Sequence, residues 1–135
     1  MKRLFLVLAL SMLITSVLTA AAPLPRTTFR LVDGLPSTMT VGETSTVIVR
    51  VSSDQTFLSA QALPSFQFPG KGVVAVQNGD HSGSGTSATL SVTFEAKSST
   101  ANMPDGRAPV HVVVGVRYAG GYVAVQDYVF YVRVP

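Results

Sequence analysis

Two histidines, His81 and His111, are the side chains best suited to acid–base or metal chemistry, and they are the only imidazoles in the chain. His81 follows Asp80 in a segment rich in glycine and serine, where both side chains could contact a metal ion. Zinc has three or four protein ligands in most sites, and the sequence offers few others to recruit. We therefore predict that the chain holds no metal and no other cofactor, and that Asp80 and His81, the only candidate ligands, belong to a turn.

A serine hydrolase site is the next chemistry to test. Asp80-His81-Ser82 contains the residue types of a catalytic triad, but consecutive residues cannot aim at one another, because triad members come from separate elements. Gly83-Ser84-Gly85 does not match the Gly-x-Ser-x-Gly pattern of a nucleophile elbow. Most acidic residues stand at expected turns, and turn formation accounts for them. The sequence therefore predicts a protein that is not an enzyme.

Aromatic side chains are the better candidates for a binding face. Phe66 and Phe68 lie in a segment bounded by prolines, and Tyr118 and Tyr122 lie on either side of Gly120-Gly121. A tyrosine combines a large apolar body with a polar tip, which suits a protein interface. We predict that Phe66, Phe68, Tyr118 and Tyr122 belong to an interaction surface, with core packing as the alternative for part of the set.

The start of the chain has the three parts of an export signal. A basic pair, Lys2-Arg3, precedes an apolar run over residues 4–18, and residues 19–22 supply the small side chains that a signal peptidase needs. Cleavage after Ala21 would leave small residues at both positions that the peptidase inspects. We interpret residues 1–22 as a signal peptide or an uncleaved signal anchor.

The anchor is an equal alternative because residues 4–22 approach the roughly 20 apolar residues that span a bilayer. The basic start would keep the N-terminus cytoplasmic in either case, so we expect the rest of the chain to be extracytoplasmic, in the periplasm or at the cell surface. The prolines at 23 and 25 make residues 23–26 a short stiff linker. The domain then covers residues 27–135.

Charge and cysteine content exclude several partners. The net charge is +3, but the export segment carries two of the ten basic residues, and the other eight lie singly among seven acidic ones. Nucleic-acid binding requires a basic stripe, so we expect no nucleic-acid partner. The chain has no cysteine, so the domain forms no disulfide and its core must be sufficient for stability.

Period-two alternation of apolar and polar residues predicts an all-β domain. Gly120-Gly121 predicts a tight hairpin turn, and Gln126-Asp127 predicts a bulge or a change of partner in the last strand. About seven strands suit an immunoglobulin-like antiparallel β-sandwich. The expected strands are Thr27–Val32, Thr44–Ser52, Phe57–Ala62, Val73–Gln77, Thr86–Glu95, Val110–Tyr118 and Tyr122–Val134.

Three segments of these strands share a pattern with a known family. They are Val41-Gly42-Glu43-Thr44 followed by Val47, Val49 and Val51; Ala88-x-Leu90-x-Val92-x-Phe94; and Asp105-Gly106-x-x-Pro109-Val110-x-Val112-x-Val114. The chain resembles the bacterial and archaeal extracytoplasmic immunoglobulin-like domains of the CARDB kind. Members of that family serve as adhesion, spacer or accessory modules, so the resemblance implies binding or scaffolding rather than catalysis.

Three functions remain open from the sequence. The first is a non-catalytic accessory or scaffold subunit, tethered through residues 4–22 and packed on a larger membrane protein assembly. The second is a freely secreted adhesion or cell-surface module. The third is a metal-binding domain or metal-dependent hydrolase that uses His81. In each of the first two, the expected partners are other proteins of a membrane or surface assembly.

Overall fold

The computed structural model describes residues 23–66 and 71–135, and the regular structure in these residues is β-strand apart from one short 3₁₀ helix. The signal peptide or anchor predicted over residues 1–22 lies outside the described residues. Within the described part, no helix is both long and apolar enough to cross a bilayer. The elements are β1 (Thr27–Asp33), β2 (Thr44–Phe57), β3 (Ser59–Phe66), β4 (Val73–Ala75), β5 (His81–Ser82), β6 (Gly85–Ala96), η1 (Pro104–Gly106), β7 (Ala108–Arg117) and β8 (Val123–Val132).

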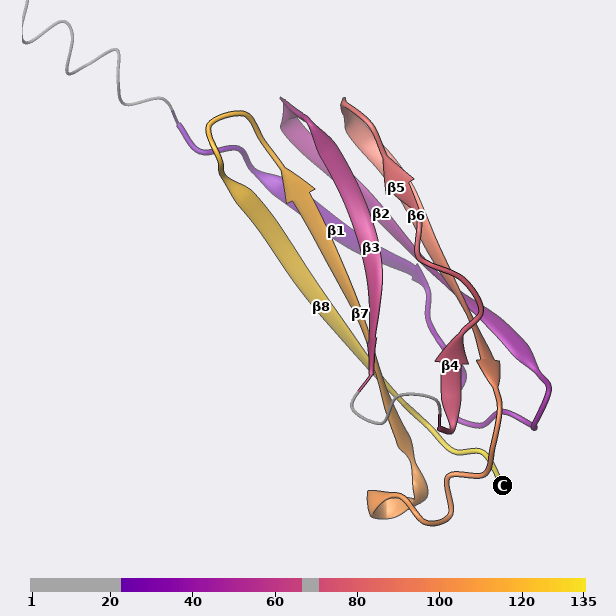
Figure 1. Cartoon of the computed structure of the whole chain (residues 1–135). Helices are drawn as coiled ribbons and strands as arrows, with labels where there is room; N and C mark the ends of the chain where they lie inside the picture. The colour runs from indigo at the N-terminus through magenta and orange to yellow at the C-terminus, as the bar shows by residue number, and fades with distance from the viewer. Residues whose placement is uncertain (1–22, 67–70) are drawn as a thin grey trace, which may run out of the picture.

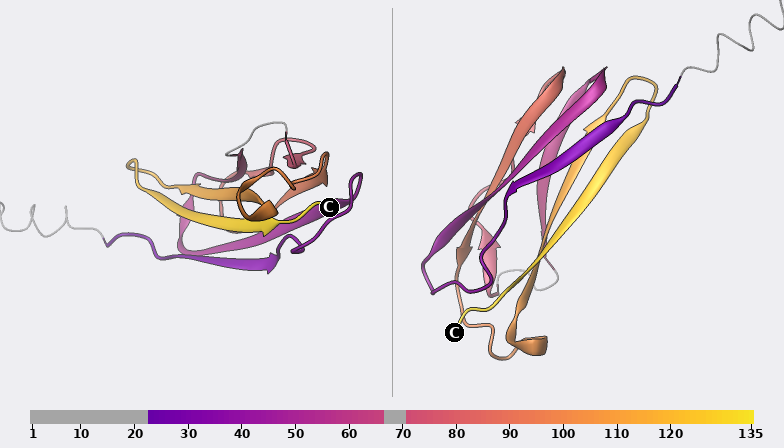
Figure 2. Two further views of the ribbon diagram at one scale, coloured as in Figure 1. Left: turned by 90° about the horizontal axis from the view of Figure 1, so that it is seen from below. Right: turned by 180° about the vertical axis from the view of Figure 1, so that it is seen from behind.

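The strands form two four-stranded sheets that pack face to face as a β-sandwich (Figures 1 and 2). One sheet has the order β1-β2-β6-β4 and the other has the order β5-β3-β7-β8. Neighbouring strands are antiparallel in every pair of the two sheets. The all-β, antiparallel prediction is therefore confirmed for the described residues.

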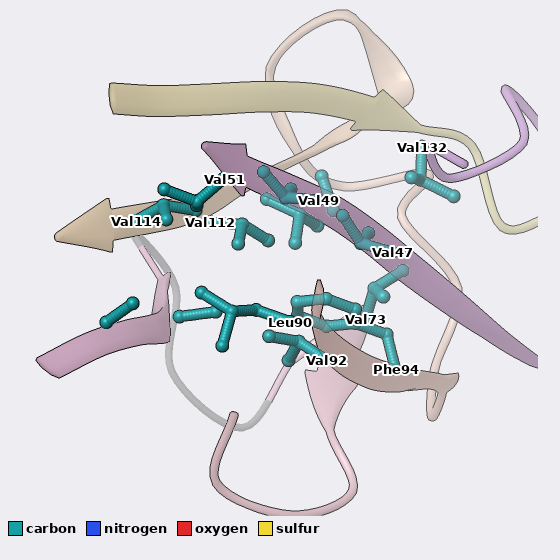
Figure 3. Close-up of a cluster of buried hydrophobic side chains, with 14 of the residues drawn as sticks. Val47, Val49, Val51, Val73, Leu90, Val92, Phe94, Val112, Val114 and Val132 are labelled. Atoms are coloured by element: carbon teal, nitrogen blue, oxygen red, sulfur yellow. The ribbon is translucent and has the colours of Figure 1, made fainter. Parts of the chain in front are cut away.

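The core lies between the sheets and is built from alternate residues of the central strands. Val47, Val49 and Val51 of β2 are each at most 1% exposed, and the even-numbered residues of β7 from 108 to 116 are buried in the same way. Figure 3 shows Val112 and Val114 of β7 beside the three valines of β2, with Leu90, Val92 and Phe94 of β6 nearby. Burial of a side chain of this size contributes about 1.5–3 kcal/mol. The predicted alternation of these strands is confirmed.

The β7–β8 hairpin forms where the glycine pair predicts it. Gly120 and Gly121 have φ angles of 86° and 88°, which glycine adopts without the steric strain of a side chain. The ladder then runs without interruption from the Arg117–Val123 pair to the Ala108–Val132 pair. The bulge predicted at Gln126-Asp127 is therefore wrong, because both residues keep regular partners on β7.

Two short elements were not expected from the sequence. The segment around His81 was interpreted as a turn, but His81–Ser82 forms β5, which pairs with β3 through His81 and Gln61. The loop before β7 contains η1, in which Asp105 has a φ of 56°. Both segments contain too few residues to produce a recognisable period in the sequence.

The C-terminal strand end is fixed between two loops. The Arg133 N–H donates to Ser37 O at 2.9 Å, and the Met39 N–H donates to Arg133 O at 2.9 Å. On the other side Thr100, which is 0% exposed, donates its hydroxyl to Gly106 O at 2.7 Å and accepts from the Val134 N–H at 2.9 Å. These bonds join the β1–β2 loop, the loop that carries η1 and the chain end at one end of the sandwich (Figure 1).

Gly79 lies where the chain crosses from one sheet to the other. The Asp80 N–H donates to Ser91 O of β6, and Asp80 O accepts from the Ala62 N–H of β3. A Cβ on Gly79 would lie 2.0 Å from Ala62 O, well inside the closest approach of real atoms. Glycine is therefore required here by close packing of backbone on backbone.

Replacing Gly79 tests this packing. We expect Gly79→Ala to lower the free energy of unfolding by about 3 kcal/mol, because the added methyl group must displace β3. Gly83→Ala is the matched control, since a Cβ there meets nothing within 4 Å. Thermal unfolding measures both variants. Equal melting temperatures for the two would contradict the close approach.

Candidate binding surface

The outer faces of the two sheets differ in chemistry. On β2 and β6 the outward positions are those that alternate with the core residues, and they pair across the strands as Thr46–Thr93, Ile48–Ser91, Arg50–Thr89 and Ser52–Ser87, with Ile48 as the one apolar residue of the set. The polar side chains keep their hydrogen-bonding groups in water, and Thr46 Oγ1 and Thr93 Oγ1 also bond each other at 2.9 Å. This face of the sandwich is therefore mainly polar over β2 and β6.

The outward face of β3, β7 and β8, which we call the β7–β8 face, exposes a group of large apolar side chains beside polar ones such as Gln61 and Arg117. Val125 and Tyr131 are the most exposed of the large apolar residues of this face, at 60% and 61%. The side chains of Leu63, Val123 and Val129 are also exposed on the same side of the sheet. A Cβ on Gly115, the partner of Val125, would meet nothing within 4 Å, so the centre of the face is open. Large exposed apolar patches are in general a characteristic of interaction sites.

The β8 strand also has a free edge. Within the described residues it pairs with β7 and with no second strand. Its inward side chains, including Tyr128 and Phe130, are half-buried. Partial burial raises the pKa of Tyr128 above its ordinary value by desolvation. The strand therefore has apolar side chains on both sides and unpaired backbone along one edge.

The polar residues of the β7–β8 face include a hydrogen-bonded pair between neighbouring strands. His111 Nδ1 of β7 lies 3.1 Å from Asp127 Oδ2 of β8. Asp127 alternates with Val125 and Val129 along the strand, so the charge divides the apolar residues into two groups. A carboxylate in this place opposes edge-to-edge pairing of β8 with other chains. An exposed pair of this kind contributes about 0.2–1 kcal/mol to stability.

The structure brings a serine beside this pair, which the sequence did not predict. Ser65 of β3 is the direct cross-strand partner of His111, so Ser65, His111 and Asp127 follow one another across three strands. The Ser65 hydroxyl makes no hydrogen bond with His111, although both residues are described. The side chains of His111 and Asp127 are 33% and 48% exposed, so water surrounds the pair. The arrangement lacks the serine–histidine contact that activates a nucleophile.

The two metal-ligand candidates have structural roles. The Asp80 carboxylate accepts hydrogen bonds from Ser91 N and Ser91 Oγ, each at 2.9 Å. His81 lies in β5 and is exposed. The described residues contain no group of three or more histidine, aspartate or glutamate side chains that could hold a metal ion.

The four aromatic residues predicted to form an interaction surface do not share one environment in the structure. Tyr122 is exposed, at 36%, and its ring lies 5.7 Å from that of Tyr118. Tyr118 is 4% exposed, so its side chain is part of the core and not of the predicted surface. Phe66 is the last residue of β3, but its side chain and the whole of Phe68 lie outside the described residues.

Tyr118 instead joins the two sheets at the end that holds the β7–β8 turn. Its hydroxyl donates to Ser53 Oγ of β2 at 2.7 Å and shares a 2.5 Å hydrogen bond with Thr27 Oγ1 of β1. Its ring packs edge-on against Phe57, with 6.5 Å between the ring centres. Burial of the phenol is thus accompanied by full hydrogen bonding.

No protein-family model matches the chain, and comparison with curated proteins finds no similar sequence. The arrangement of residues in the structure is therefore the basis for inferring a function.

Removing the Tyr118 hydroxyl tests whether this side chain stabilises the core or belongs to the surface. We expect Tyr118→Phe to lower the free energy of unfolding by about 1–2 kcal/mol, because two partly buried hydroxyl groups lose a partner. Tyr122→Phe is the matched control and should change stability by no more than about 0.5 kcal/mol. Chemical denaturation measures both variants. A stable Tyr118→Phe protein would contradict the core assignment.

Proposed function

We propose that the chain is a non-catalytic extracytoplasmic accessory or scaffold subunit, whose β7–β8 face packs on a larger membrane protein assembly. The observation that carries this proposal is the contrast between the two outer faces. Both belong to one sandwich and both meet solvent, yet only the β7–β8 face exposes Val125, Val129 and Tyr131. Apolar side chains grouped on one face contribute binding energy when a partner covers them.

The proposed fold is immunoglobulin-like. Constant-type immunoglobulin domains place the first, second, fifth and fourth strands in one sheet and the other three in the second. The order β1-β2-β6-β4 opposed to β3-β7-β8 matches this pattern once the two-residue strand β5 is counted as an addition to the second sheet. The likeness to CARDB domains supports a binding or scaffolding function, since such domains act as accessory or adhesion modules. It rests on the quoted sequence pattern.

The orientation follows from where the domain begins. Residue 23 and the β7–β8 turn lie at one end of the sandwich, while η1 and the C-terminus lie at the other (Figures 1 and 2). If residues 4–22 form the anchor, the turn faces the membrane and the η1 end points away from it. The long axis of the β7–β8 face then runs outward from the bilayer, beside any neighbouring membrane protein.

A freely secreted adhesion module is the second candidate, and the small residues at 19–22 favour it. N-terminal sequencing of protein purified from its host cells distinguishes the two. A start at Ala22 indicates release from the membrane, and a start at Met1 or Lys2 indicates a tether. We do not pursue a metal-dependent function, because Asp80 is already hydrogen-bonded to Ser91.

Partner capture from detergent-solubilised host membranes tests the docking face. We expect Val125→Glu to lower the yield of co-purified partner by at least about tenfold, because a charged carboxylate would replace an apolar side chain in the interface. Ser52→Glu is the matched control, with the same charge change on the polar face of the other sheet. It should leave the yield unchanged. An equal fall in partner yield for both variants, or no fall for Val125→Glu, would contradict the proposed docking face.

The proposal that the chain is non-catalytic can be tested separately. Purified protein should hydrolyse p-nitrophenyl acetate no faster than a Ser65→Ala variant, since the Ser65 hydroxyl is not activated by His111. Turnover that disappears in Ser65→Ala would contradict this part of the proposal.

A further inference from the structure

A hollow of about 620 Å³ lies at the η1 end of the sandwich, beside the β7–β8 face. Small-molecule and peptide side-chain sites have volumes on the order of 300–1,000 Å³, so this hollow is large enough to hold a ligand group. Its lining is Pro104, Asp105, Arg107, Pro109, His111, Tyr131 and Arg133. Tyr131 belongs both to the hollow and to the β7–β8 face, so the two are continuous.

The two arginines come together through the register of the hairpin. Ala108 and Val132 form the last pair of the ladder, and Arg107 and Arg133, the residues that flank this pair, both line the hollow. Arg107 keeps an extended backbone, with φ −131° and ψ 145°, and both arginines therefore alternate outward from the buried Ala108 and Val132. Like charges that lie close together on neighbouring strands repel one another.

Nothing in the described residues neutralises this pair. Neither guanidinium group has a hydrogen bond or an ion pair with another described residue. Asp105 lines the same hollow but forms no ion pair with Arg107 or Arg133 within the described part of the chain. The guanidinium donors are free to bind an external oxyanion. Arginine suits a carboxylate better than lysine does, because its planar group donates two parallel hydrogen bonds.

Hydrogen bonds fix the segments that line the hollow. Thr100 is fully buried, and its hydroxyl donates to Gly106 O at 2.7 Å, directly after Asp105. The left-handed backbone of Asp105, with φ 56°, gives the η1 turn its shape. Arg133 is fixed through its backbone bonds to Ser37 and Met39. Elements held in this way preorganise a binding site, which limits the entropy lost on binding.

We propose that this hollow binds a carboxylate of an acidic peptide segment from the protein partner, between Arg107 and Arg133. The inference rests on the proposed function, because the occupant is part of the protein that covers the β7–β8 face. Tyr131 and the two prolines offer apolar contacts to the peptide backbone and to the stems of its side chains. A partner segment with apolar residues followed by glutamate or aspartate matches the surface from Val125 toward Arg133.

The other sheet provides a matched control. Arg30 of β1 and Arg50 of β2 are direct cross-strand partners, and both are exposed. Arg50 lines only a smaller hollow, of about 240 Å³, together with Ser87, Ala88 and Thr89. This second pair has the same charge, but its hollow has neither the aromatic side chain nor the prolines of the proposed site.

Fluorescence anisotropy with the detergent-solubilised full chain tests the inference. The probe is a blocked tetraglutamate peptide that carries an uncharged dye, and a blocked tetraglutamine peptide is its neutral counterpart. We expect saturable binding of tetraglutamate only. In the double variant Arg107→Gln/Arg133→Gln the Kd should rise at least about tenfold, because each charge-assisted hydrogen bond contributes about that factor. In Arg30→Gln/Arg50→Gln the Kd should stay within about twofold of the parent value.

Three results would overturn the inference. The first is no saturable binding of tetraglutamate, and the second is an equal loss in both double variants, which would indicate non-specific attraction. The third is competition by succinate or inorganic phosphate as strong as by unlabelled tetraglutamate, which would indicate a small-anion site. Capture of the partner by Val125→Glu protein is an independent measurement. If peptide binding fails while Val125→Glu still loses its partner, the arginine site is wrong and the docking face stands.

Discussion

The two-residue period of the strands, combined with burial of one face of each sheet, is the constraint on which the rest of the structure depends. Once the even-numbered residues of β7 enter the core, the odd-numbered ones must face outward, and the ladder imposes the same choice on β8. The outward set then consists of Val123, Val125, Val129 and Tyr131, with Asp127 between them. The candidate binding surface is therefore a direct consequence of how the core packs.

The same constraint explains why polar groups gather at the two ends of the sandwich. Between the sheets only side chains without polar atoms pack well, whereas the ends must satisfy backbone groups that leave the ladders. Thr100 does this at the η1 end, whereas at the end with the β7–β8 turn the Tyr118 hydroxyl bonds the side-chain hydroxyls of Ser53 and Thr27. No buried side-chain nitrogen or oxygen among the described residues lacks a partner. The rigid η1 end in turn positions Arg107 and Arg133.

The sequence predicted the parts of the fold that alternate. Val47, Val49 and Val51 occupy the positions that period two assigned to them, and Gly120-Gly121 forms the expected turn. The bulge at Gln126-Asp127 was wrong because polarity within a strand was interpreted as a break, whereas the ladder accommodates both residues on regular positions. Short elements such as β5 depend on tertiary pairing, which a local pattern does not encode.

Less of the candidate binding surface could be predicted from the sequence. Tyr118 was expected on the surface, but its hydroxyl finds partners on β1 and β2 that are remote along the chain. The β8 strand has apolar residues in both registers, a sequence pattern typical of strands whose two faces are both covered. The juxtapositions of Ser65 with His111, and of Arg107 with Arg133, require the register of paired strands and could not be predicted from composition.

Cysteine labelling tests the central claim most directly, because the chain has no cysteine of its own. Single variants Val125→Cys and Ser52→Cys, expressed in the native host, are exposed to a membrane-impermeant maleimide before and after the protein is purified away from its partners. The account predicts that Val125→Cys reacts slowly in native membranes and rapidly once purified, while Ser52→Cys reacts rapidly in both. Equal, rapid labelling of Val125→Cys in both states would contradict a covered β7–β8 face.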